Sequence, residues 1–155
     1  MVKIIYWNVQ GALDLGFNCP FKLLIKKRRL DIFAIMEPYI SGFEADNIIR
    51  RSGFDSSYRV EAQGFSGRIW ILSRDTMRVN VLVFSNQYVH VHCAMSDGGG
   101  SFFVSFVYAS LDAMKQCYLW EQLMALDPGS RFPWVVGGDM NVIGSISERR
   151  SGSQH

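Results

Sequence analysis

The feature that most constrains the fold is a run of four apolar segments in the middle of the chain with no helical segment between them. These segments are 68–73, 78–84, 88–94 and 102–108. They are rich in β-branched and aromatic residues, and turn-forming stretches such as Asp-Gly-Gly-Gly (97–100) separate them. Successive strands without helices between them pair antiparallel. The middle of the chain therefore predicts an antiparallel sheet.

Strands and helices alternate on both sides of this run. Apolar runs predict further strands at 2–9, 31–36 and 133–136, and helical spacing predicts helices at 21–30, 44–51 and 112–126. This order predicts an α/β (α+β) fold, a mixed and mostly antiparallel two-sheet sandwich flanked by helices. A length of 155 residues with 48% hydrophobic residues suits one domain, 1–155.

Charge and cysteine content narrow the class of protein only slightly. The net charge of +2 is weakly basic, and we interpret the basic segment 22–29 as a solvated helix face rather than a phosphate-binding patch. The three cysteines match neither a zinc site nor a disulfide framework, which indicates reduced thiols. No apolar stretch approaches transmembrane length. We expect a soluble intracellular protein, nuclear or cytoplasmic, with no membrane partner.

Polar side chains stand where three apolar strands end. Asn8, Glu37 and Asp139 occupy these positions, and Asn141 follows two residues later, on the same side of an extended chain. Such oxygen ligands suit Mg²⁺, which takes few protein ligands and keeps several waters. Acids also commonly end strands and cap turns, and for any one of these residues alone that is the better interpretation.

Four motifs make the interpretation more specific because they occur together and in order. They are Tyr-Trp-Asn-Val-Gln-Gly (6–11), Met-Glu-Pro (36–38), Val-Tyr-Ala-Ser (107–110) and Gly-Gly-Asp-Met-Asn-Val (137–142). This set resembles the endonuclease/exonuclease/phosphatase family over nearly the whole chain. The phrase Trp-Val-Val-Gly-Gly-Asp-Met-Asn-Val-Ile, followed by Glu-Arg-Arg-Ser-Gly, is most similar to the endonuclease domains of plant LINE-type retrotransposons.

The resemblance implies a four-layered fold, a DNA substrate and Mg²⁺ as cofactor, with Mn²⁺ as a possible substitute. It implies that Glu37 binds the metal and that Asn8 supports it. Asp139 would align or deprotonate the attacking water, and Asn141 would position that water or the scissile phosphate. Tyr108 would hydrogen-bond the phosphate or support the acid.

The chain departs from the family pattern at several positions. Gln10 stands where the first motif usually carries an acid, Met36 where many relatives have Gln, and Leu111 where an Asn is common. Arg68 stands where the glycine-led strand often has a small residue. A Gln still offers a carbonyl oxygen to a metal but adds no charge.

The family pattern also ends with a Ser-Asp-His sequence after a further acid-bearing strand. His155 follows Ser-Gly-Ser-Gln and lacks both the Asp and that strand, so we do not expect it to be catalytic. By this comparison roughly the last third of the family domain is missing. The expected consequences are little turnover by the isolated chain and an exposed sheet edge through which it associates. Two alternatives stay open: a catalytically dead relic that binds nucleic acid or metal weakly, and a small-phosphoester phosphatase of the same fold.

Other predictions concern packing. Alternation places His90 and His92 on one face of a strand and Cys93 on the other, and we expect the two histidines to face solvent. The helix at 112–126 is expected to begin at Asp112. One of its faces is expected to hold Cys117, Trp120, and Leu123 or Met124. Three tryptophans in strands are expected in the core: Trp7, Trp70 and Trp134.

Overall fold

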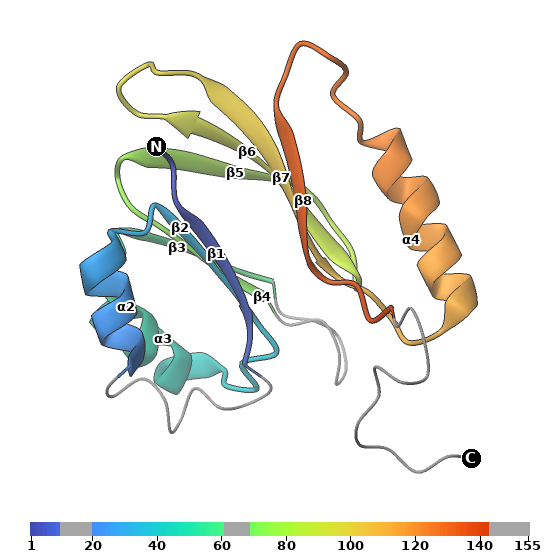
Figure 1. Ribbon diagram of the computed structural model, residues 1–155. Helices are drawn as coiled ribbons and strands as arrows, with labels where there is room; N and C mark the ends of the chain where they lie inside the picture. The colour runs from blue at the N-terminus through green and yellow to red at the C-terminus, as the bar shows by residue number, and fades with distance from the viewer. Residues whose placement is uncertain (10–19, 61–68, 143–155) are drawn as a thin grey trace.

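The computed structural model describes residues 1–9, 20–60 and 69–142, and in them two four-stranded sheets face each other (Figure 1). The first sheet has the order β1-β2-β4-β3, with β1 Ile4–Asn8, β2 Ile32–Met36, β3 Ser56–Val60 and β4 Ile69–Ser73. The second has the order β5-β6-β7-β8, with β5 Met77–Phe84, β6 Tyr88–Met95, β7 Ser101–Tyr108 and β8 Trp134–Asp139. The helices are α2 Pro20–Arg28, α3 Gly42–Ser52 and α4 Ala113–Ala125.

The pairing within the sheets confirms the expected mixed sandwich. β1 pairs with β2 and β7 with β8 in parallel, and every other pairing between the described strands is antiparallel. α2 and α3 cover the outer face of the first sheet, and α4 covers that of the second (Figure 1). The layers are thus helix, sheet, sheet and helix.

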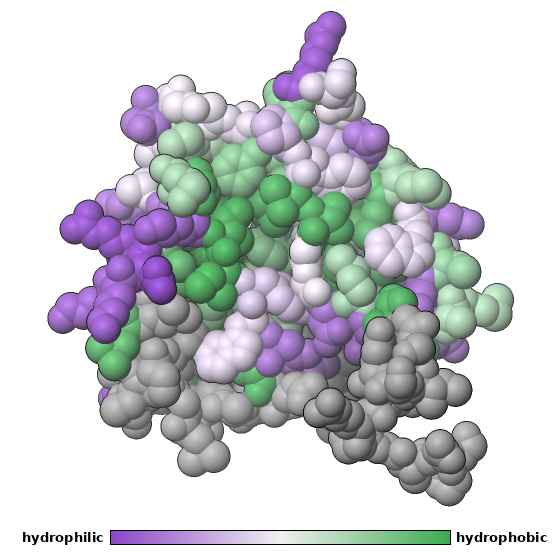
Figure 2. Space-filling model, in the orientation of Figure 1, coloured by the Kyte–Doolittle hydropathy of each residue, from purple (hydrophilic) through white to green (hydrophobic). Residues whose placement is uncertain are grey.

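The first sheet has a hydrophobic cluster on each face because its two central strands are apolar and buried throughout. All five residues of β2 are buried, which explains why Ile-Phe-Ala-Ile-Met shows no polar alternation. Ile32, Ala34 and Met36 belong to the cluster between the sheets, whereas Phe33 and Ile35 pack toward α2 and α3. Figure 2 shows apolar side chains gathered along the junction between the sheets.

Helix α4 confirms the predicted cap, and only part of the predicted apolar face is buried. The side chain of Asp112 accepts a hydrogen bond from the backbone N–H of Lys115, as an N-cap does. The helix buries Leu119 and Leu123, whereas Cys117 is exposed. Two other residues predicted for the same face as Cys117 are also exposed, Trp120 at 41% and Met124 at 70%. The helix carries apolar residues all round, so hydrophobicity alone could not fix which side meets the sheet.

Two further differences have simple causes. Strand β3 is missed by sequence reasoning because its residues Ser-Ser-Tyr-Arg-Val are mostly exposed and carry little apolar signal.

Of the tryptophans expected in the core, Trp70 is buried at 2% exposure, but Trp7 is 38% exposed and Trp134 only partly buried. Trp7 lies on an edge strand, where no further described strand covers it.

No helix in the described part of the chain is both long enough and apolar enough to cross a membrane.

The expectation that His90 faces solvent is wrong. His90 is 3% exposed, and its Nδ1 lies 2.7 Å from the Oγ of Ser105. That hydroxyl also accepts a hydrogen bond of 3.0 Å from the indole N–H of Trp134. The imidazole stacks on Phe103 with ring centroids 5.5 Å apart. Aromatic neighbours therefore cover this face, while Cys93 is buried on the opposite face, as alternation predicts.

This burial predicts a loss of stability in weak acid. Burial lowers the pKa of His90, so the folded protein keeps the ring neutral at pH values where the unfolded chain, with a pKa of about 6.5, takes up a proton. The contribution is complete above about pH 6.5 and is lost as the pH falls toward the lower folded-state pKa. One proton changes the free energy of unfolding by at most about 1.4 kcal/mol per pH unit.

Urea denaturation at about pH 7.5 and about pH 5.5 measures this loss. We expect His90→Asn to flatten the pH dependence and the control His92→Asn to retain it. An unchanged slope in His90→Asn would show that other groups cause the effect.

Candidate active site

The carboxyl ends of four strands meet at one edge of the sandwich. In the first sheet Asn8 is paired with Met36 across the parallel strands β1 and β2, so Glu37 follows directly beside Asn8. In the second sheet Tyr108 is paired with Asp139 across the parallel strands β7 and β8. Figure 1 shows β1 and β8 side by side and ending at the same lower edge. Parallel pairing within each sheet thus brings together residues that are distant in sequence.

A side-chain hydrogen bond joins the two sheets at this edge. The amide Nδ2 of Asn8 donates to the Oδ2 of Asp139 at 3.1 Å, and the pair is partly buried. The other carboxylate oxygen, Oδ1, accepts from the backbone N–H of Asn141 at 3.0 Å. Both oxygens of Asp139 are therefore oriented by fixed donors.

A tyrosine that sequence reasoning missed holds the backbone of the same acid. The hydroxyl of Tyr6 accepts a hydrogen bond of 3.0 Å from the backbone N–H of Asp139 and donates to the carbonyl of Val107 at 3.1 Å. Tyr6 lies two residues before Asn8 on one strand, so both side chains point to the same face. The two-residue spacing from Asn8 could have indicated that Tyr6 faces the site. Nothing in the sequence showed that its hydroxyl would reach the other sheet.

The pKa of the Tyr6 hydroxyl is shifted by its surroundings. Burial is the main cause that raises the pKa of Tyr6, the backbone hydrogen bond with Asp139 opposes it, and the charges of Asp139 and Glu37 raise the pKa further. Hydrogen bonds join Asn8, Asp139 and Asn141, and Glu37 follows Met36, the residue paired with Asn8 on the neighbouring strand.

The turn after β8 is tied to the end of β7. Asn141 adopts a left-handed conformation with φ 46°, and its Nδ2 donates to the carbonyl of Ala109 at 2.6 Å. The backbone N–H of Ala109 in turn donates to the carbonyl of Asp139 at 2.8 Å. This turn holds the acid and the following asparagine in one fixed arrangement.

Tyr108 lies beside Asp139 but is oriented differently from the expectation. It is 9% exposed, and its hydroxyl donates to the carbonyl of Ser85 at 2.5 Å. Burial raises the pKa of this hydroxyl, and the neighbouring Tyr6 raises it further. The side chain packs into the core between the sheets, and the tyrosine hydroxyl that hydrogen-bonds Asp139 here, at its backbone N–H, is that of Tyr6. The role expected of Tyr108 stays a prediction.

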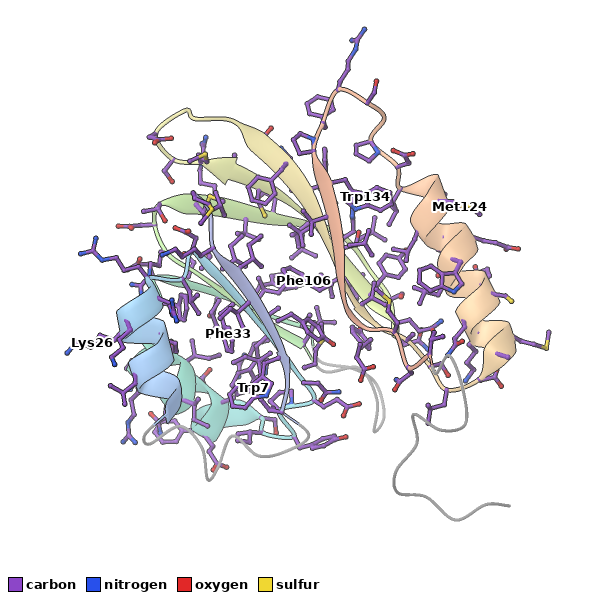
Figure 3. The ribbon with its side chains drawn as sticks, in the orientation of Figure 1. Trp7, Lys26, Phe33, Phe106, Met124 and Trp134 are labelled. Atoms are coloured by element: carbon purple, nitrogen blue, oxygen red, sulfur yellow. The ribbon has the colours of Figure 1, made fainter. Side chains whose placement is uncertain are left out.

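Glu37 lies in a strained turn at the end of β2. Both Glu37 and Tyr39 have positive φ values, 51° and 52°, which side chains other than Gly rarely adopt. The hydroxyl of Tyr39 donates to the Oε2 of Glu37 at 3.2 Å. Trp7, labelled in Figure 3, lies near the end of β1, the strand that is paired with β2.

The donor chemistry of the site fits Mg²⁺ better than a metal bound by nitrogen or sulfur. Two carboxylates and an amide oxygen come from Glu37, Asp139 and Asn8, and Mg²⁺ is commonly bound by one or two carboxylates and several waters. Among the described residues, no three His, Cys, Asp or Glu side chains cluster as a metal site made by protein alone would require. Gln10 and His155 lie outside the described residues.

The fold and the site define a class: a two-sheet α/β sandwich that presents carboxylates and amides at the carboxyl ends of its strands. A family model described as "Endonuclease/Exonuclease/phosphatase family" matches residues 5–154. The chain therefore belongs to this family, whose enzymes generally use divalent metal ions. No curated protein matches the sequence significantly.

Solved structures agree on the fold. The endonuclease domain of TRAS1, a telomere-specific non-LTR retrotransposon, has a TM-score of 0.66 and 19% identity over 92% of this chain and 62% of its own. TDP2 from D. rerio, complexed with a single-strand DNA product, gives 0.61 and 12% over 92% and 61%. The mannosyl-6-phosphatase Bt3783 from Bacteroides thetaiotaomicron gives 0.58 and 11% over 92% and 66%. The chain thus spans less than two thirds of each of these structures.

The role of Tyr6 yields a stability prediction. Tyr6→Phe keeps the ring but leaves the N–H of Asp139 and the carbonyl of Val107 without their partner at the sheet junction. The expected loss in free energy of unfolding is about 1–3 kcal/mol, measured by urea denaturation. Tyr58→Phe is the control, because Tyr58 is 40% exposed on β3. Equal stabilities of the two variants would show that the Tyr6 hydroxyl does not join the sheets.

Proposed function

We propose that residues 1–155 form one domain of a Mg²⁺-dependent phosphodiesterase that cleaves DNA, of the kind found in LINE-type retrotransposons. The observation that carries the proposal is the carboxylate of Asp139, which accepts hydrogen bonds from Asn8 on one oxygen and from Asn141 on the other, with Glu37 following the strand partner of Asn8. Such an arrangement suits the hydrolysis of a phosphodiester, which needs an aligned water and positive charge near the phosphoryl oxygens.

The residues have separate roles in this proposal. Glu37 and Asn8 hold Mg²⁺, which supplies Lewis-acid stabilisation of the phosphoryl oxygens when bound. Asp139 accepts a hydrogen bond from the attacking water and takes its proton, and its fixed orientation favours one direction of attack. Asn141 holds the turn at the end of β8 and positions the phosphate or the water. Besides Asn141, Tyr108 is a candidate for contact with the phosphate, although in this structure its hydroxyl donates to the carbonyl of Ser85.

DNA is favoured over a small phosphoester by two observations. The phrase that runs through Asp139 and the following Glu-Arg-Arg-Ser-Gly resemble retrotransposon endonuclease domains most. A retrotransposon endonuclease domain and a TDP2 complexed with a DNA product are among the structures that share the fold. The fold relation to a mannosyl-6-phosphatase keeps a small phosphoester as the second candidate.

An association surface belongs to the same proposal. Within the described residues β8 is an edge strand, and its Val135 and Val136 are 51% and 36% exposed. An apolar edge of this kind pairs readily with another strand, and we propose it as the place where the chain associates.

Nicking of supercoiled plasmid DNA tests the function. The expectation of little turnover by this chain stays a prediction, so the assay uses protein in excess over DNA and long incubations. We expect slow nicking that requires Mg²⁺ or Mn²⁺ and stops with a chelator, and no metal-dependent hydrolysis of p-nitrophenyl phosphate. Hydrolysis of that small ester without any nicking would show that the substrate is a small phosphoester and not DNA. Nicking that persists in chelator would reject the metal-dependent mechanism.

A further inference from the structure

Tyr39 presents an exposed aromatic ring from a firmly anchored turn. Its neighbour Pro38 is buried, and Ile40 on the other side packs against the cluster beneath α2 and α3. Tyr39 itself is 52% exposed. The backbone is therefore fixed on both sides of a side chain whose ring lies at the surface.

The hydroxyl of Tyr39 fixes the direction of this ring. It donates to the Oε2 of Glu37 at 3.2 Å, so the phenol edge is attached to the acid proposed to hold the metal. The turn accepts two non-glycine residues in the left-handed region, Glu37 and Tyr39, to make this contact. Such conformations persist where the surrounding structure imposes them, and they cluster at functional sites.

We propose that the ring of Tyr39 stacks on an unpaired nucleobase next to the phosphate bound at Glu37 and Asp139. The consequence is a preference for single-stranded or locally opened DNA over fully paired duplex. This inference rests on the proposed function and specifies the form of its substrate.

The chemistry of the ring supports this choice of ligand. The hydroxyl of Tyr39 is bonded to Glu37 while the side chain stays 52% exposed, so part of the ring is open to a ligand. Every nucleobase offers a π-face whatever its sequence. Bases inside a duplex are already stacked on each other, so only an unpaired base can use the ring. Loss of one base–aromatic stack weakens binding by about fivefold to about a hundredfold.

Fluorescence of 2-aminopurine tests the stacking directly. Short single strands with the probe at successive positions are titrated with the protein in Ca²⁺, which replaces Mg²⁺ as an oxygen-bound cation. Stacking on Tyr39 is expected to quench one probe position selectively. Tyr39→Ala should remove this quench and weaken binding by about fivefold or more, while Tyr39→Phe should retain the quench because it keeps the ring. Tyr118→Ala is the matched control, since Tyr118 is 60% exposed on α4.

The outcomes separate this inference from the proposed function. Unchanged quenching and affinity in Tyr39→Ala would overturn the inference, and metal-dependent nicking by the same protein would leave the function in place. Equal affinity for single strand and blunt duplex would also overturn it. A Tyr39-dependent quench in a protein that never nicks DNA would support the inference and reject the function. Failure of the unmutated protein to bind any oligonucleotide would overturn the inference, whatever the nicking assay gives.

Discussion

Asp139→Asn is expected to reduce metal-dependent nicking to background, a loss of at least about a hundredfold. The substitution keeps the shape of the side chain and an oxygen that can accept from the backbone N–H of Asn141, but it removes the negative charge and the ability to take a proton from water. The fold should therefore be retained while the chemistry is lost. Single-turnover nicking with protein in excess measures the effect, and circular dichroism checks the fold.

Asp127→Asn is the matched control for this experiment. Asp127 also accepts a hydrogen bond from the backbone N–H two residues later, Gly129, at 2.9 Å, but it lies in the exposed turn after α4. This variant should nick DNA like the unmutated chain. Persistent nicking in Asp139→Asn, or an equal loss in Asp127→Asn, would remove Asp139 from the proposed role.

Gly138→Ala is expected to destabilise the protein by about 3 kcal/mol and to disturb the site as well. Gly138 has φ 143°, and a Cβ built on it would overlap the carbonyl oxygen of Val107 and lie 2.8 Å from its nitrogen. Both obstacles are backbone atoms of β7, which cannot move without breaking its pairing with β8. The strand would have to shift next to Asp139. Urea or thermal unfolding measures the loss.

The neighbouring glycine provides the control. A Cβ built on Gly137 meets no atom within 4 Å, so Gly137→Ala should change stability by no more than about 0.5 kcal/mol. If both variants unfold alike, then the close approach of β8 to β7 is not what requires glycine at position 138.

The strand ends of the site could be predicted because each lies at the end of an apolar run. Apolar strands lead into Asn8, Glu37 and Asp139 and can be recognised in the sequence, although only the strand before Glu37 is fully buried. The order of strands without helices predicts the two-sheet sandwich. The hydrogen bond between Asn8 and Asp139 could not be predicted in the same way. It joins residues 131 positions apart in different sheets, and only the packing of one sheet on the other sets that distance.

Sequence reasoning missed or misplaced several residues whose role depends on which atoms the end of the side chain contacts. Tyr6 and Tyr108 both lie in apolar strands, and sequence reasoning favoured Tyr108, whereas the hydroxyl of Tyr6 is the one that reaches Asp139. Tyr39 carried no signal because a positive φ at a non-glycine residue is invisible in sequence. His90 was expected in water because the aromatic cover over it comes from β7 and from the start of β8, separate segments of the chain.

The central claim is a divalent metal site organised on Glu37 at the junction of the two sheets, and titration with Mn²⁺ followed by electron paramagnetic resonance tests it most directly. The folded chain is expected to bind Mn²⁺ in competition with Mg²⁺. Glu37→Gln should weaken this binding by at least about tenfold, because it removes the charge of a ligand. Glu44→Gln, an exposed acid in the first turn of α3, should leave it unchanged. Equal affinities of Glu37→Gln and the unmutated chain, or no Mn²⁺ binding by the folded protein, would contradict the account.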